Sequence, residues 1–448
     1  MKYQFMNAKK VILWSITVAL GGFLFGFDTA VISGAEQEIQ QLWGLSDTII
    51  GQMVGMALYG TVIGALLGAY PADILGRKKS LFWIAILYFI SAVGSALAPD
   101  VYFLMLFRFI GGLGVGASSV IAPMYIAEIA PREKRGQLTA LFQFNIVFGI
   151  MLAYFSNYLI GGGGDGNWRL MLGIEGIPAL AFVILILTVP RSPRWLIVKR
   201  GLVDEAKRVL TIINPEAVDE NLKEIQEHHD ANAKEVGIKE FLSGKYLRPI
   251  LLAFLLAFFN QMSGINAVIY YAPRIFTETG MGDEASLLSS VGIGIVNLVF
   301  TMVGLALIDR MGRRFLMYIG SIGYIISLAL VAFAFLSGFG LGTMLVPILL
   351  FVFIASHAIG QGAVIWVFIT EIFPNDVRSY GNSLGCGTHW VFAALVSSVF
   401  PYFAGQFGSG IIFSFFAVMM VFQLLWVWKI MPETKGKSLE ELEGIMVK

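Results

Sequence analysis

The chain is poor in the residues on which most soluble enzymes and nucleic-acid binders depend. Of its 448 residues, four are histidine, one is cysteine and 14 % are charged. The lone cysteine, Cys386, excludes an intrachain disulfide and a cysteine metal cluster. A net charge of +1 provides no basic surface for nucleic acid. Apolar residues are abundant instead, at 57 % of the chain with a mean hydropathy of +0.76, which is typical of a helical membrane protein.

Long apolar runs recur along the whole sequence, and each is long enough to cross a bilayer as a helix. Lys9 and Lys10 precede the first run, which we expect to remain as a helix and not to be cleaved as a signal peptide. The predicted spans are 11–33, 48–70, 80–98, 101–127, 136–160, 168–190, 248–277, 286–308, 315–336, 343–370, 381–404 and 409–431.

Positive charge is confined to alternate connections between these runs. All Lys and Arg residues except Arg108, Arg169 and Arg274 lie at the termini, in the connections after the even-numbered helices, or in the long central segment. Cytoplasmic loops carry an excess of Lys and Arg. The sequence therefore predicts a multi-pass protein with both termini in the cytoplasm.

Three short motifs occur twice. DILGRKK at 73–79 returns as DRMGRRF at 309–315, EIAPREKR at 128–135 returns as EIFPNDVR at 371–378, and PRSP at 190–193 has a weaker partner in PETK at 432–435. Two membrane repeats around a central site are the usual architecture of a secondary transporter. The predicted fold is all-α, with two six-helix bundles at 1–190 and 248–431, a cytoplasmic helical linker at 191–247 and a cytoplasmic tail at 432–448.

Three ionisable residues fall inside predicted spans: Asp28, Arg108 and Glu175. A charge at mid-membrane costs about 2.5–3.5 kcal/mol on insertion scales, so each needs a partner or a task. We interpret Asp28 with Arg108 as a proton site, in which protonation of Asp28 would release Arg108; a purely structural ion pair is the alternative. Glu175 is either a further member of this site or an anchor for its helix end.

The ordered set of motifs resembles the sugar porters of the major facilitator superfamily, from one end of the chain to the other. The likeness is greatest to bacterial proton-coupled sugar symporters of the xylose–proton type. The matching segments are 73–78, 108–112, 123–128 (PMYIAE), 135–136, 190–195 (PRSPRW), 261–266 (QMSGIN), 270–271, 309–314, 371–374 and 432–436.

The resemblance implies roles for individual residues. Asp28 corresponds to the proton-coupling aspartate and Arg108 to its partner. Sugar ligands are implied at Gln261 and Asn266. Further positions implied at or near the sugar are Gln143, Asn297, Trp366 and Trp390. The chemistry is consistent, because an amide offers a donor and an acceptor to a sugar hydroxyl and tryptophan offers an apolar face. Hydrogen bonding between helices is the alternative for the amides.

Other pocket positions depart from the family pattern. Ile150 stands where related symporters usually have a sugar-binding glutamine, and Asn260 precedes Gln261 in place of a glutamine pair. His389 precedes Trp390 where Gln or Asn is usual. His357 and Gln361 stand where relatives have mostly apolar residues. We include Asn260, His357, Gln361 and His389 among the candidate sugar ligands, with hydrogen-bonded packing as the alternative for the histidines, and the identity of the sugar stays open.

The repeated motifs also predict a charge network at the cytoplasmic side. Their opposite charges can clamp one half against the other, and opening inward would break those bonds. The residues of this network are Asp73, Arg77, Glu128, Arg135, Asp309, Arg313, Glu371 and Arg378.

The sequence thus predicts a symporter that imports a monosaccharide, a pentose or a hexose, with a proton by alternating access. A proton-independent facilitator and a cyclitol or polyol porter are alternatives; a non-transporting sugar sensor is disfavoured by the short tail. No nucleotide motif and no nucleophile–base or metal-ligand set is present, so we expect neither an enzyme nor a cofactor or metal. Sugar, proton and the lipid bilayer are the expected partners, with no nucleic acid and no obligatory protein partner. The short loops suggest a bacterial inner membrane.

Overall fold

The computed structural model describes residues 2–131, 134–161, 166–231, 237–337, 342–374, 376–437 and 439–446. Within these ranges the regular elements are helices, which confirms the predicted all-α class. Twelve of the described helical segments are long and apolar enough to cross a membrane, as the sequence predicts.

The spanning helices fall into nine continuous and three broken ones within the described residues. The continuous helices are α1 (Lys2–Trp43), α2 (Asp47–Leu67), α4 (Arg77–Ala96), α5 (Val101–Ile129), α6 (Arg135–Gly161), α15 (Asp283–Met311), α16 (Arg313–Ser337), α19 (Arg378–Phe407) and α20 (Ser409–Lys429). The broken ones are α7 (Asn167–Gly173) with α8 (Gly176–Ile186), α13 (Leu247–Met262) with α14 (Ile265–Glu278), and α17 (Gly342–Ile359) with α18 (Gln361–Ile372).

Two features of these helices differ from the apolar runs. Helix α1 continues to Trp43, beyond the predicted end at 33. Its last turns carry polar residues, so a prediction based on hydropathy stops before them. The other difference is the breaks themselves. Gly264 has a left-handed backbone (φ 81°), and Gly360 interrupts the tenth span. Hydropathy reports where a chain is apolar, not where its helical hydrogen bonds are interrupted.

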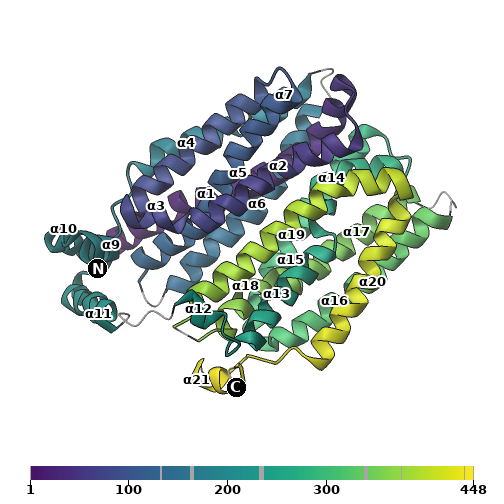
Figure 1. Ribbon diagram of the computed structural model, residues 1–448. Helices are drawn as coiled ribbons and strands as arrows, with labels where there is room; N and C mark the ends of the chain where they lie inside the picture. Colours follow the sequence, from purple (N-terminus) through teal and green to yellow (C-terminus); the bar gives the residue numbers. More distant parts are fainter. Residues whose placement is uncertain are drawn as a thin grey trace. The chain divides into compact units, whose positions relative to one another are not determined.

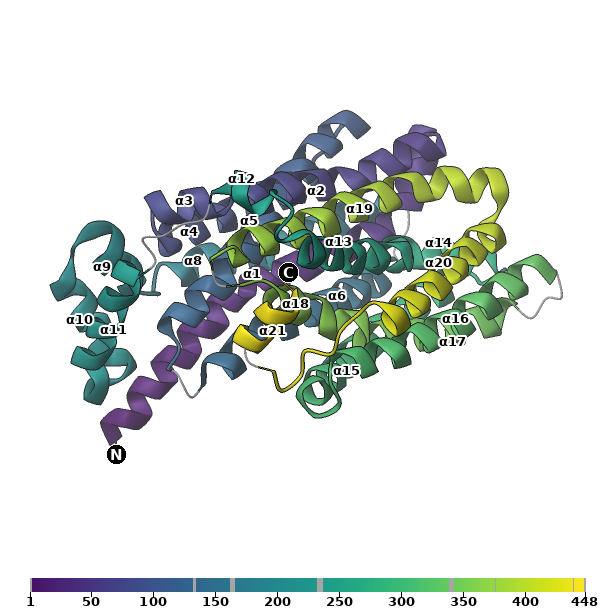
Figure 2. The same ribbon diagram turned by 60° about the horizontal axis from the view of Figure 1, so that its bottom comes forward.

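Short helices lie at the repeated motifs, in the central segment and near the end of the described chain. They are α3 (Ala69–Ile74), α9 (Pro193–Arg200), α10 (Val203–Ile213), a 3-10 turn (Pro215–Ala217), α11 (Val218–Ala231), α12 (Ile238–Phe241) and α21 (Leu439–Met446). Ser192 caps α9 by accepting from Trp195 N, and Trp195 packs with Leu196 and Ala206 in a small core. Figure 2 shows α9, α10 and α11 gathered together.

Contacts divide the chain into two compact units, each described by itself. Unit 1 comprises Met1–Asp28, Tyr59–Ile150 and Leu172–Glu235; unit 2 comprises Thr29–Leu58, Met151–Met171 and Val236–Lys448. In unit 1, α4 packs on α5 and α8. In unit 2, α16 packs on α17 and α20, and the three lie side by side in Figures 1 and 2. The predicted domain boundaries at 190, 247 and 431 stay a prediction.

Two glycines bring α1 and α6 together inside unit 1. A Cβ at Gly26 would lie 1.8 Å from the carbonyl oxygen of Ile146, and one at Gly149 would lie 2.1 Å from that of Phe23. No real Cβ tolerates such distances, so the two backbones meet directly, as small residues allow in membranes. This close packing holds the part of α1 that belongs to unit 1, which ends at Asp28, against α6.

Candidate transport site

A buried charge group lies in unit 1. Nη1 of Arg108 on α5 donates to Oδ1 of Asp28 on α1 at 3.2 Å, and the two side chains are 2 % and 5 % exposed. Glu175, which directly precedes α8, is also buried and interacts electrostatically with both. The structure therefore brings together the three ionisable residues that the sequence placed inside the membrane.

This charge group contains unused hydrogen-bonding capacity. Nε and Nη2 of Arg108 have no partner among the described residues. The guanidinium is thus held by one bond to Asp28, while Glu175 lies within electrostatic range without a bond to it. An arginine with spare donors beside two carboxylates can change partner when one carboxylate takes up a proton.

Tyr88 on α4 is a member of this group that the sequence analysis missed. It is fully buried, its hydroxyl donates to the carbonyl oxygen of Gly21 at 3.4 Å, and it lies within electrostatic range of Asp28 and Glu175. No motif surrounds Tyr88, and a tyrosine in a spanning helix is ordinary, so no sequence signal singled it out.

A polar cluster in unit 2 is organised by Gln261, at the end of α13. Its Nε2 donates to Oδ1 of Asn260 at 2.9 Å and lies 3.2 Å from a ring nitrogen of His389, while its Oε1 accepts from Nδ2 of Asn266 at 2.8 Å. Gln261 is fully buried. Its amide is therefore used by protein partners, and its place is to hold Asn266 and His389 in position.

Half-buried members of the same cluster offer surface to a solute. Asn266, Trp366 and His389 keep part of their surface exposed, whereas Asn260 and Gln261 do not. The centroid of the His389 ring lies 5.0 Å from the ring centroid of Trp366 and 4.8 Å from that of Trp390. The break at Gly264 sets Gln261 and Asn266 on two helix pieces, a common construction for solute sites in transporters. The cluster thus combines the amide of Asn266, the imidazole of His389 and the indole face of Trp366.

His357 on α17 has its own partner. The Tyr324 hydroxyl on α16 lies 2.5 Å from Nδ1 of His357, and the two rings are 6.0 Å apart. Tyr324 is fully buried, and sequence analysis missed it because it stands in no motif. The bond fixes the His357 ring through its Nδ1 nitrogen.

The remaining candidate sugar residues lie outside these bonded groups. Gln361 on α18 is fully buried and donates to Gln423 on α20, which in turn donates to Ser321 on α16, so it belongs to helix packing. Asn297 on α15 is 7 % exposed and accepts from Thr301 at 3.3 Å. Gln143 lies on α6 in unit 1, half-buried.

The first copy of the charge motif forms a closed network within unit 1. Arg77 pairs with Asp73 and with Glu128, each at 3.0 Å. Its Nη1 also donates to the carbonyl oxygen of Ala72, and Ser192 donates to Glu128. The side chain of Arg135 lies outside the described part of the chain.

The second copy repeats this arrangement within unit 2. Arg313 pairs with Asp309 at 3.2 Å and with Glu371 at 2.6 Å, and Thr434 donates to Glu371 at 2.7 Å. Arg378 donates to the carbonyl oxygen of Phe373 instead. Each described network is internal to one unit, so the predicted clamp between halves stays a prediction.

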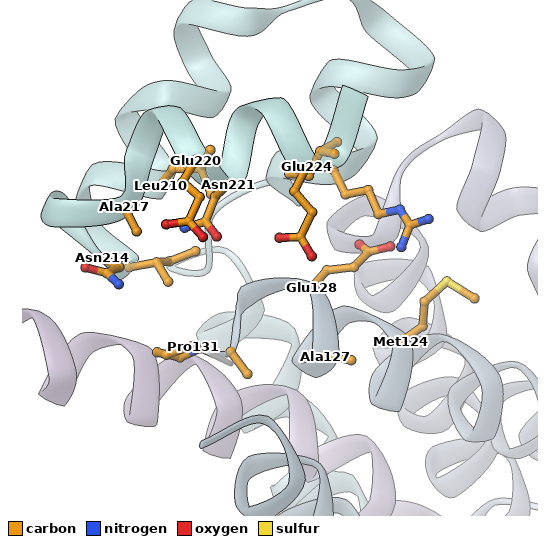
Figure 3. Close-up of a pocket in the computed structure, with 14 residues that line it drawn as sticks. Met124, Ala127, Glu128, Pro131, Leu210, Asn214, Ala217, Glu220, Asn221 and Glu224 are labelled. Atoms are coloured by element: carbon orange, nitrogen blue, oxygen red, sulfur yellow. The ribbon is translucent and has the colours of Figure 1, made fainter. Parts of the chain in front are cut away.

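A cavity of ≈ 440 Å³ adjoins the first network, between the end of α5 and the helices α10 and α11. Figure 3 shows Glu220 and Glu224 on α11 directed toward the end of α5, which carries Glu128. Glu128 thus connects the charge motif to the short helices of the central segment.

Comparison with known proteins identifies relatives over almost the whole chain. The family model described as "Sugar (and other) transporter" matches residues 14–445. A D-xylose transporter of Levilactobacillus brevis is 40 % identical, over 96 % of this chain and 94 % of that protein. The D-xylose-proton symporter of Escherichia coli strain K12 is 35 % identical, over 98 % of this chain and 96 % of that protein.

Solved structures agree with these sequence matches. The inward-open conformation of the xylose transporter XylE from E. coli superposes with a TM-score of 0.85 at 34 % identity, over 96 % of this chain and 99 % of that chain. The proton:xylose symporter XylE bound to 6-bromo-6-deoxy-D-glucose gives 0.81 at 35 % identity, over 98 % and 100 %. The resemblance drawn from the sequence motifs is confirmed.

Proposed function

This chain belongs to the Sugar (and other) transporter family, a family of multi-pass membrane carriers and not of enzymes, and we propose that it imports a monosaccharide together with a proton by alternating access. The observation that carries the proposal is the buried Asp28–Arg108 pair with Glu175 beside it. A coupled carrier needs a buried carboxylate that can take up and release a proton, and among the described residues Asp28 is bonded to an arginine with unused donors.

In this proposal Asp28 is the proton carrier. When ionised, it holds Arg108 through Nη1. When Asp28 takes a proton from outside, the attraction is lost and Arg108 is free to turn its spare donors toward Glu175. Each proton that moves inward gains about 2.3 kcal/mol per 100 mV of membrane potential. The fully buried side chain of Tyr88 excludes water from one side of the two carboxylates.

The sugar site is the unit 2 cluster. Asn266 and His389 bind sugar hydroxyls, Trp366 covers the C–H face, and Gln261 holds the first two in place. A site lined by paired polar groups rejects a solute that lacks the hydroxyls, since those groups would be left unpaired on burial. Relatives named for D-xylose and arabinose make pentoses the first sugars to test.

Several less direct assignments complete the proposal. The termini are cytoplasmic, on the distribution of Lys and Arg, and the protein resides in a bacterial inner membrane, on its short loops and its bacterial relatives. The two charge networks, around Arg77 and Arg313, then lie at the cytoplasmic side and control opening there. Within unit 2, the surroundings of the sugar are completed by Asn260, His357, Asn297 and Trp390, and Gln361 supports the helices behind it. The family resemblance also assigns Gln143 to the sugar.

The test is the external pH of lightly buffered, energy-depleted cells that express the protein, as pentoses, hexoses, deoxyhexoses and inositol are added one at a time. Alkalinisation with one sugar identifies the substrate and the proton symport together. In Asp28→Asn we expect sugar exchange without alkalinisation or uphill uptake. Asp100→Asn is the matched control, since Asp100 only caps α5 and asparagine also caps.

Two results would contradict the proposal. Saturable uptake of a labelled sugar without a pH change in the parent protein would show a facilitator. Accumulation by Asp28→Asn that still responds to external pH would remove Asp28 as the proton carrier.

A further inference from the structure

A buried ion pair joins the first repeat to the second, at the end of the helices opposite the 73–79 and 309–315 motifs. Nε of Arg274 on α14 donates to Oε1 of Glu36 on α1 at 2.8 Å, and Nη2 donates to the other carboxylate oxygen. The Glu36 side chain is fully buried and that of Arg274 is 13 % exposed. Nη2 of Arg274 also donates to Gln40 at 2.6 Å, so Nε and Nη2 are both used in hydrogen bonds.

Arg274 faces more than one carboxylate. Asp47 lies 4.0 Å from its Nη1 and accepts from Gln40, and Glu278, which accepts from Ser409, is within electrostatic range. Three carboxylates thus surround a single guanidinium. Without that cation they would repel one another at close range.

The two partners sit on elements with different freedom. Glu36 lies in the uninterrupted part of α1, whereas Arg274 follows several breaks in the α13–α14 span. Gly264 is left-handed, Tyr271 has non-helical angles (φ −126°, ψ 20°), and Pro273 directly precedes Arg274. Such positions interrupt the helical hydrogen bonds and permit a helix piece to tilt separately.

The ion pair lies within a tight contact between the two repeats in unit 2. A Cβ at Gly51 on α2 would lie 1.9 Å from the carbonyl oxygen of Ser398 on α19. The Tyr154 hydroxyl on α6 donates to the carbonyl oxygen of Ile269 on α14 at 2.6 Å. At this end, helices of the first repeat thus contact helices of the second directly.

We infer that Glu36 and Arg274 are an outer latch: their ion pair holds the extracellular entrance closed and separates once in each transport cycle as α14 tilts away from α1. The inference rests on the alternating access and the orientation proposed above. Both residues lie outside the sugar and proton sites.

The burial of the pair suits this role. In the closed state each charge depends on the other, because water is excluded. When the entrance opens, water reaches both charges and replaces the bond, so separation recovers the desolvation cost. Loss of one partner alone leaves an uncompensated charge in the closed state, and opening then becomes the way to hydrate it. Arg274→Gln leaves three carboxylates facing one another, so it is expected to favour opening more than Glu36→Gln does.

The test is an electron spin–spin distance across the outer end, in protein reconstituted in lipid nanodiscs without sugar. Spin labels go on Leu42→Cys in the first repeat and Glu284→Cys in the second, both exposed, in a Cys386→Ser background that removes the native thiol. The variants are Arg274→Gln, Glu36→Gln and the charge-retaining Arg274→Lys. The matched control is Glu38→Gln, since Glu38 is also on α1 but, among the residues that the structure describes, accepts from backbone N–H groups of Gly166 and Trp168 in its own repeat.

We expect Arg274→Gln to raise the ratio of long to short distances at least about tenfold, Glu36→Gln to shift it in the same direction, and Arg274→Lys to shift it less. Glu38→Gln should match the parent. Parent-like distances in both Arg274→Gln and Glu36→Gln would overturn the latch, as would an equal shift in Glu38→Gln. If Arg274→Gln does not fold, the comparison of the distances in Glu36→Gln with those in Glu38→Gln is sufficient to support or overturn the latch. No sugar or proton gradient enters this measurement, so its result is separate from that of the transport assay.

Discussion

Arg313 makes in the second repeat the contacts that Arg77 makes in the first. Each pairs with the aspartate four residues before it, with a glutamate at the end of a later helix, and with the carbonyl oxygen of the residue before that aspartate. Each glutamate also accepts from a hydroxyl in the third repeated motif, Ser192 or Thr434. The duplication seen in the sequence therefore extends to individual hydrogen bonds.

The two ion pairs of Arg313 should differ in strength. Asp309 is 83 % exposed, whereas Glu371 is 23 % exposed and bound through two nitrogens. A double-mutant cycle between Arg313→Ala and Glu371→Ala, read from unfolding in detergent, should give a coupling energy of about 1–3 kcal/mol. The cycle with Asp309→Ala should give less than about 1 kcal/mol, because exposed pairs are screened. Equal couplings would show that burial does not decide the strength of this network.

The positions of the helices follow from sequence, but their interruptions do not. Spanning length and apolar composition were enough to predict all twelve described spans. The breaks at Gly264 and Gly360 depend on backbone angles that many glycines in this chain do not adopt. Hydropathy cannot distinguish those glycines, so the kinked helices were predicted as continuous.

Gln261 should contribute to sugar binding by holding other groups. In Gln261→Ala, Asn266 and His389 each lose a partner and are free to turn away from the sugar. We expect the affinity for the transported sugar to fall about tenfold at normal expression, since an unsatisfied buried group costs about 1–3 kcal/mol. Binding of labelled sugar to purified protein measures this.

Gln361→Ala is the matched control for that variant. Gln361 is equally buried, but it bonds to Gln423 in the helix packing of unit 2. Its loss should lower the melting temperature while sugar affinity stays within about twofold of the parent, because no member of the cluster changes partner. Parent-like affinity in Gln261→Ala would separate Gln261 from the site, and a tenfold loss in Gln361→Ala would place Gln361 in it.

Tyr324 should tune the choice of sugar through His357. Tyr324→Phe keeps the ring but removes the hydroxyl that lies 2.5 Å from Nδ1 of His357. The imidazole can then rotate. The ratio of the affinities for two sugars that differ in one hydroxyl should therefore fall by about threefold to tenfold, which corresponds to the loss of one hydrogen bond. Competition by a panel of pentoses against one labelled sugar gives the ratio. Tyr318→Phe on the same helix, where Arg314 stacks on the ring, should leave it unchanged.

How much of the site was predictable depends on whether a residue stands in a motif. Asp28, Arg108, Gln261 and Asn266 could be named because a charge in a membrane, or an amide within a motif, is conspicuous in a sequence. Partners such as Tyr88 and Tyr324 are ordinary aromatic residues until the fold sets them beside a carboxylate or an imidazole. The Glu36–Arg274 pair joins residues 238 positions apart, and no repeated motif contains either of them.

Two glycines on one helix allow the backbone contact between α1 and α6 to be tested. Alanine favours a helix over glycine by about 1 kcal/mol, so Gly→Ala should stabilise α6 wherever there is room for a methyl group. Gly136 has nothing within 4 Å of its Cβ position, and Gly136→Ala should be neutral or stabilising. At Gly149 the Cβ would lie 2.1 Å from the carbonyl oxygen of Phe23, a backbone atom that can move only if α1 moves. We therefore expect Gly149→Ala to destabilise the protein by at least about 1–3 kcal/mol, the usual cost of overpacking.

Because the displaced part of α1 leads directly to Asp28, Gly149→Ala should also disturb proton coupling. Sugar-induced alkalinisation should fall more than sugar binding does, as unit 2 holds the binding cluster and unit 1 the charge group. Melting in detergent, together with the two transport measurements on Gly136→Ala and Gly149→Ala, distinguishes this result from a general loss of folded protein. If both variants melt and couple like the parent, the close contact of α1 and α6 does not constrain the charge group.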